Sequence, residues 1–101
     1  MVVLAGLTGC SYASHDCSGG TCGVLLNGVG AHIDIDAEHI DGPGASGAIN
    51  VELMALAPDR ATLTVNGAEV TCAPEESHAV GDLQVTCRSI NEDNMTMEIS
   101  R

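Results

Sequence analysis

Apolar and polar residues alternate one by one along most of this chain, and this period of two constrains its fold more than any other feature. The clearest case is TLTVNGAEVTC, residues 62–72, in which Asn66-Gly67 is the residue pair that type I′ turns favour. The stretch therefore predicts a β-hairpin with a two-residue loop. Such a loop puts the apolar side chains of both strands on one face, in the pairs Val65–Ala68, Leu63–Val70 and Ala61–Cys72.

A second hairpin is expected at the end of the chain. Its two strands alternate through Leu83, Val85 and Cys87 and through Met95, Met97 and Ile99. Matching the two apolar faces requires Cys87 to lie opposite Met97, because a shift of one residue moves every side chain to the other face. We expect a loop of odd length, three or five residues within 90–94, with Asn91 or Asn94 at positive φ.

The alternation runs from Thr21 onward and predicts an all-β fold. The segment 41–47, DGPGASG, is expected as a loop because glycine and proline punctuate it. The composition of 51–57, VELMALA, also suits a helix, but its short length and flanks favour a strand. We expect a small antiparallel β-sandwich or partly open barrel of about six or seven short strands in one domain. The expected strands are 21–27, 31–37, 48–57, 60–66, 68–73, 82–89 and 95–100.

The chain begins with VVLAGLTGC at residues 2–10, an apolar run followed by small residues and a cysteine. This is the shape of the end of a secretory signal. Leu7-Thr8-Gly9-Cys10 resembles the lipobox of bacterial lipoproteins. The resemblance implies that the thiol of Cys10 is joined to lipid, that the signal is cut before this residue, and that the acyl chains hold the protein on a membrane.

On that basis the chain divides into three parts. Residues 1–9 are the remnant of a lipoprotein signal peptide, 10–20 are the lipid-attachment cysteine and a tether, and 21–101 are the β domain. The alternative for residues 2–7 is a first β-strand rich in valine and leucine.

A wider resemblance supports the lipoprotein interpretation. The order of lipobox, DCSGGTC at 16–22 and AEVTCAPEESHAVGDLQVTCRSINEDNMTMEI at 68–99 resembles small lipoproteins of high-GC Gram-positive bacteria and of their phages or prophages. The resemblance implies an envelope location. For phage-encoded members it suggests, by analogy alone, a role in blocking superinfection at the cell surface.

The five cysteines fit this interpretation. If lipid occupies Cys10, four cysteines remain, and they can form two bridges in three ways. We predict Cys17–Cys22, because two glycines in CSGGTC permit a tight loop, and Cys72–Cys87, because strand register turns both toward the core. Disulfides are expected to stabilise this chain because its core is poor in large side chains, since Tyr12 is the only aromatic residue. The alternative is a zinc site that adds His15 or His78, but exported chains favour disulfides.

Charge and motif content exclude several classes of function. The net charge is −11, and the chain has three arginines and no lysine. Nucleic-acid binding is excluded because no basic surface exists to neutralise phosphates. Cations or basic surfaces are the partners that such a charge favours. The alternative is that the charge only keeps the protein soluble. On the outer face of the last hairpin we expect Arg88 beside Glu98. No Gly-x-Ser-x-Gly or comparable nucleophile context occurs, so we expect neither an enzyme nor a cofactor.

Two acidic segments are candidate cation sites. HIDID at 32–36 puts His32, Asp34 and Asp36 on one strand face, and His39 follows, so these four residues are candidate metal ligands. The alternative is the solvated face of an amphipathic strand. INEDN at 90–94 gathers carboxylates and amides that suit Ca²⁺, but it lacks the EF-hand pattern, and an acidic turn is the alternative.

Together these features predict an exported, lipid-anchored binding module at the extracytoplasmic face of the cell membrane. Its expected partners are the membrane, through the N-terminal lipid, and an envelope protein or other cell-surface component. The alternatives are an exported protein that binds divalent cations and a structural component of the envelope.

Overall fold

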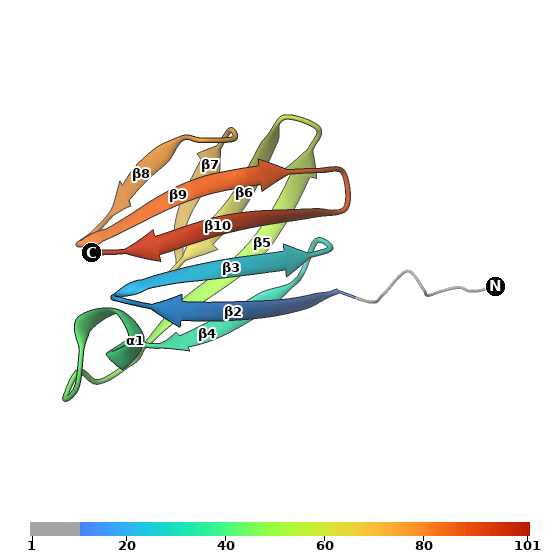
Figure 1. The fold of residues 1–101 in the computed structure, drawn as a ribbon. Coiled ribbons are helices and arrows are strands. Elements are labelled where there is room, and N and C mark those ends of the chain that lie inside the picture. Colours follow the sequence, from blue (N-terminus) through green and yellow to red (C-terminus); the bar gives the residue numbers. More distant parts are fainter. Residues whose placement is uncertain (1–10) are drawn as a thin grey trace.

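The computed structural model describes residues 11–101, which fold into two antiparallel sheets packed face to face (Figure 1). The five-stranded sheet has the order β2-β3-β10-β9-β8, and the four-stranded sheet has the order β4-β5-β6-β7. The small antiparallel β-sandwich is thereby confirmed, and within the described residues the sheets do not close into a barrel. The strands of the first sheet are β2 (Tyr12–Ser18), β3 (Thr21–Asn27), β8 (Ser77–Val80), β9 (Leu83–Ile90) and β10 (Asn94–Ser100). Those of the second are β4 (His32–Asp36), β5 (Ala48–Ala57), β6 (Arg60–Val65) and β7 (Ala68–Cys72).

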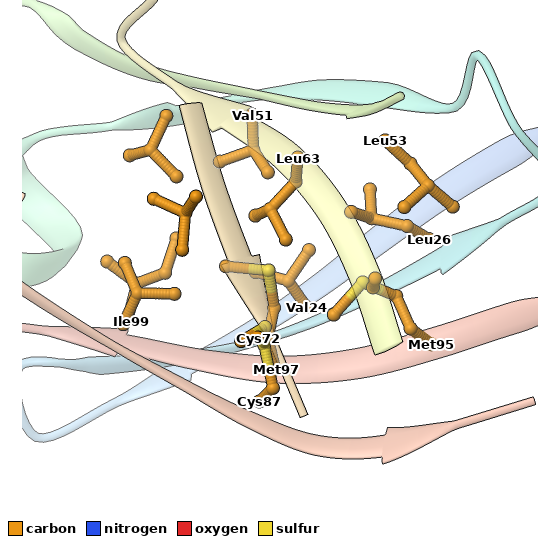
Figure 2. Packing of buried hydrophobic residues seen from close by; sticks show 14 of the residues in the cluster. Val24, Leu26, Val51, Leu53, Leu63, Cys72, Cys87, Met95, Met97 and Ile99 are labelled. Carbon is orange, nitrogen blue, oxygen red and sulfur yellow. A yellow bond between two sulfur atoms is a disulfide. The ribbon is translucent and has the colours of Figure 1, made fainter. Parts of the chain in front are cut away.

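The core lies between the sheets and is filled by the inward members of each alternating strand (Figure 2). No polar or charged side chain of residues 11–101 is buried. Stability therefore comes from packing of aliphatic, methionine and cysteine side chains, whose burial is favourable in proportion to area. The side chains labelled in the figure are Val24, Leu26, Val51, Leu53, Leu63, Cys72, Cys87, Met95, Met97 and Ile99.

The hairpin of β6 and β7 has the predicted register. Its cross-strand partners include Val65 with Ala68 and Ala61 with Cys72. Asn66 and Gly67 have φ of 52° and 85°, the left-handed values that both central positions of a type I′ turn require. The predicted turn and the predicted core face are therefore both confirmed.

The last hairpin has the predicted register, and residues 91–93 between β9 and β10 have one of the two predicted loop lengths. Cys87 lies opposite Met97, as expected. The one-residue shift that this register requires, however, is supplied by a β-bulge in β9. Ser89 pairs with Thr96 and Cys87 pairs with Met97, so Arg88 between them has no partner in the ladder. The expectation that the loop itself corrects the register is wrong. Neither Asn91 nor Asn94 is among the residues with positive φ.

Both predicted disulfides are present. Cys17–Cys22 joins neighbouring strands of the β2–β3 hairpin, where the two residues are cross-strand partners. Cys72–Cys87 joins β7 to β9 and therefore links the two sheets through the core (Figure 2). Because these bridges use all four sulfur atoms, the alternative of a zinc site built on them is wrong.

Two strands were not expected. Residues 11–20 were expected as a tether and loop, but Tyr12–Ser18 forms β2, which pairs with β3 along its whole length. Ser77–Val80 forms β8 beside β9. Both are edge strands of the five-stranded sheet, and neither sequence alternates apolar with polar residues, YASHDCS in β2 and SHAV in β8. The β domain therefore begins at the start of β2 and not at residue 21.

The segment between β4 and β5 is a loop apart from one helical turn, α1 (Glu38–Asp41). The segment 51–57 is part of β5, as expected, and not of a helix. No helix among residues 11–101 is long and apolar enough to cross a bilayer. The lipidation of Cys10, the signal remnant at 1–9 and the alternative strand at 2–7 lie outside the described residues.

Candidate binding face

A shallow groove of about 540 Å³ crosses the outer face of the five-stranded sheet. Its floor is Gly23 of β3, which pairs with Asp16 on one side and with Glu98 on the other. Directly opposed residues point to the same face of a sheet, so both carboxylates flank the glycine. With strands about 4.8 Å apart, the two acidic residues lie on the order of 10 Å from each other, on either side of an empty position.

The backbone of β3 does not require glycine at position 23. Gly23 is not among the residues with positive φ, so a residue with a side chain adopts this conformation without strain. A Cβ placed there meets only the carbonyl oxygen of Asp16 at 3.8 Å, which is ordinary van der Waals contact. The fold therefore tolerates a side chain at position 23, and its absence leaves space in the groove between Asp16 and Glu98.

The two carboxylates of the groove have different surroundings. Glu98 Oε1 accepts a hydrogen bond from Arg88 Nη2 at 2.9 Å, and the other guanidinium nitrogen reaches Glu75 Oε1 at 3.0 Å. Hydrogen bonding to Glu98 and the charges of both carboxylates raise the pKa of Arg88 above its ordinary value. No cation among residues 11–101 lies within ion-pair distance of Asp16. The groove thus presents one carboxylate available to an incoming cation.

Hydroxyl groups line the rest of this face. In the row next to Gly23, Ser14 and Thr96 flank the half-buried side chain of Leu25. The hydroxyl of Thr96 lies 2.7 Å from that of Ser89. The groups on this face with which a ligand can make contact are therefore carboxylates, hydroxyls and an aliphatic side chain.

The structure does not bring the predicted metal ligands of β4 together for cation binding. His32 Nδ1 lies 3.2 Å from the carbonyl oxygen of Gly30. Asp34 Oδ1 accepts a hydrogen bond from Asn50 Nδ2 at 2.7 Å. These side chains stand on an exposed strand face, engaged with their nearest neighbours.

The other two candidate ligands also have local roles. Asp36 Oδ1 accepts a hydrogen bond from the backbone N–H of Glu38 and thereby stabilises the start of α1. His39 lies on α1, and its ring centroid is 5.9 Å from that of His15 on β2. Among residues 11–101, no three side chains of histidine, cysteine, aspartate or glutamate are grouped as metal ligands would be.

A second hollow, of about 400 Å³, lies at the end of the sandwich where β10 finishes. Arg101 donates to both carboxylate oxygens of Asp41 and lies 3.3 Å from Asp82 Oδ2. The hydrogen bonds and charge of Arg101 hold the pKa of Asp41 below its ordinary value of 3.8. Arg101, which follows β10, therefore forms ion pairs both with α1 and with the turn before β9.

Sequence reasoning predicted the contact of Arg88 with Glu98, which is confirmed, but it missed the groove. The available signal was a glycine in the middle of an alternating strand, since an isolated glycine in a strand marks a place where another group approaches the backbone closely. Recognising the groove also required knowing that β2 and β10 both flank β3, and β10 is far from the other two strands in the sequence.

The fold and this face define a small two-sheet β domain with a polar, groove-bearing surface. Comparison of the chain with protein-family models, with curated proteins and with solved structures finds no match.

Proposed function

We propose that this protein is an exported, lipid-anchored β domain that binds a cell-surface partner through the groove over Gly23. The observation that carries the proposal is the unfilled position between Asp16 and Glu98. A strand interior gains stability from a side chain at such a site. Its absence, at a position where a side chain fits, is the property of a surface adapted to a ligand.

The location rests on cysteine chemistry. The four cysteines of the described residues lie in disulfides, which persist in oxidising compartments and are rare in the cytosol. The fifth, Cys10, ends the stretch that resembles a lipobox. Acylation of that thiol and export of the chain account for an odd number of cysteines in a domain with two bridges.

Charge defines the chemistry of the partner. The chain carries a net charge of −11. Arg88 lines the groove beside Glu98, but no cation among residues 11–101 lies within ion-pair distance of Asp16. A lysine or arginine side chain of a partner beside Asp16 supplies the positive charge that this carboxylate lacks, while Glu98 keeps its contact with Arg88. The partner we propose is therefore an envelope protein that presents a basic residue on a flat or extended surface.

The test compares capture of envelope proteins by the wild-type domain and by Gly23→Val, which fills the groove. Ala55→Val is the matched control, because Ala55 is also exposed on a strand but lines neither hollow. We expect a protein that is retained by the wild type and by the control and is lost with Gly23→Val. Equal capture by all three forms contradicts the proposed site. Intact mass of protein made with its native upstream sequence tests the anchor, and an unmodified Cys10 contradicts it.

A further inference from the structure

Three large apolar side chains are exposed in residues 11–101, and all three lie toward one end of the sandwich. They are Tyr12, Val29 and Met54, with 55%, 57% and 47% of their surface accessible. Single exposed apolar residues are common and need no explanation. Three exposed apolar side chains at one end of a small domain, by contrast, form a feature that requires an explanation.

The backbone contacts show why they share an end. Tyr12 opens β2 and pairs with Asn27, the last residue of β3. Val29 lies in the turn that follows, and the N–H of the next residue donates to the carbonyl oxygen of Leu53 at 2.8 Å. Met54 comes directly after Leu53, at the bulge of β5. In Figure 1 this is the end of the sandwich at which β2 begins and β3 ends.

The opposite end has a different character. It carries α1, the glycine-rich loop from 42 to 47 and the ion pairs of Arg101 with Asp41 and Asp82 (Figure 1). Among the described residues, none of the large apolar side chains exposed to solvent lies there. The two ends of the domain therefore differ: the three large exposed apolar side chains lie at one end, and the ion pairs of Arg101 lie at the other.

The chain itself indicates what covers the apolar end. Cys10 precedes Tyr12 by two residues, and two residues of extended chain span at most about 7 Å. A lipid on that thiol brings the bilayer surface within this distance of the start of β2.

We propose that the end bearing Tyr12, Val29 and Met54 rests on the outer surface of the lipid bilayer. This inference depends on the proposed function, because it gives the anchored domain a defined orientation. The tyrosine ring suits the headgroup level, where an apolar body and a polar tip are both accommodated, and the aliphatic side chains reach the upper acyl region. The strands then stand away from the membrane, and the groove over Gly23 opens sideways toward a partner in the same envelope.

The charged groups at this end limit the depth of contact. The loop between β9 and β10 carries Glu92 and Asp93, and the carbonyl oxygen of Asp93 accepts a hydrogen bond from Gly28. Carboxylates are repelled by anionic lipid and do not enter hydrocarbon. The contact is therefore shallow and is stronger on zwitterionic than on anionic vesicles.

The chain offers a clean spectroscopic test, since it contains no tryptophan and no lysine. The full chain with its disulfides intact is coupled through Cys10 to phosphatidylcholine vesicles that contain a maleimide lipid and brominated acyl chains. Single tryptophans are introduced at two exposed positions, as Val29→Trp at the apolar end and Ser46→Trp at the opposite end. Far-UV circular dichroism establishes that both variants are folded.

We expect the emission of Val29→Trp to shift to the blue and to be quenched by bromine, while Ser46→Trp remains unquenched. Met54→Trp is a second reporter and behaves like Val29→Trp. Equal quenching of both ends, or none at either, overturns the proposed orientation. Because coupling replaces natural acylation, the two proposals can fail separately. Quenching of Val29→Trp together with an unmodified Cys10 in native protein supports the membrane-facing end and refutes the anchor.

Discussion

The two disulfides have different positions in the sandwich, and their removal is expected to have different consequences. Cys72–Cys87 links the sheets and closes a sequence separation of 15 residues, whereas Cys17–Cys22 closes 5 residues within one hairpin. In the chain-entropy model the first contributes about 3 kcal/mol and the second roughly 2 kcal/mol. Against a total stability of about 5–15 kcal/mol for a small domain, either loss is large.

The structure increases this difference. Cys72 and Cys87 are 1% and 0% exposed in the core, so the double substitution to alanine also removes packed atoms and separates β7 from β9. Cys17 lies on the edge strand β2, which can detach while the rest of the sandwich persists. We expect Cys72→Ala/Cys87→Ala to lower the stability of the whole domain by at least about 3 kcal/mol. Cys17→Ala/Cys22→Ala should chiefly loosen β2.

Urea unfolding with two probes separates these outcomes. Far-UV circular dichroism reports on both sheets, and fluorescence of Tyr12, the only aromatic residue, reports on β2. With an m-value of about 1–3 kcal/mol/M, loss of the inter-sheet bridge lowers the midpoint by about 1–3 M for both probes together. Loss of the hairpin bridge moves the tyrosine transition below the circular dichroism transition. Coincident transitions with equal losses in the two variants would refute the reasoning.

Three further predictions concern the strand, the turn and the chain end. Gly23→Ala should raise stability by about 0.5–1 kcal/mol in urea unfolding, since the backbone there tolerates a side chain; a loss would show that glycine serves the fold. Asn66→Ala should cost about 1–2 kcal/mol, because alanine resists positive φ and the hydrogen bond from Asn50 N–H to the Asn66 side chain is lost; an unchanged thermal midpoint would contradict this. Arg101→Gln should raise the pKa of Asp41 toward 3.8, measured by NMR of the carboxyl group. Because folding lowers the pKa of Asp41, the contact stabilises the protein at pH values above the ordinary carboxyl pKa, and this stabilisation is lost as the pH falls through the folded-state pKa. The stability of the variant should therefore depend less on pH in this acidic range.

Much of the architecture could be predicted because it depends on neighbouring residues. The Asn66-Gly67 turn and the alternation on either side of it define the β6–β7 hairpin without reference to the rest of the molecule. The same matching of apolar faces placed Cys87 opposite Met97. Once these two registers are known, Cys72 and Cys87 both point inward, and the bridge between the sheets follows.

The errors occur where a local pattern is weak or where two patterns conflict. β2 and β8 are edge strands, and their polar residues show no alternation that would distinguish a strand from a loop. The odd register of the last hairpin could be satisfied by the loop or by a bulge. The structure uses a bulge at Arg88, which also brings its guanidinium between Glu75 and Glu98.

The sequence by itself determined the strand class, the hairpin registers and the two disulfides, because turn chemistry and side-chain periodicity act between residues close in the chain. Only the tertiary structure decided which strands became edges, where the ladder bulged and which outer residues came together. The groove needs β2, β3 and β10 side by side, and the apolar end needs β2, the turn after β3 and the bulge of β5. Those neighbourhoods arise from packing of two sheets over one core, and no local pattern encodes them.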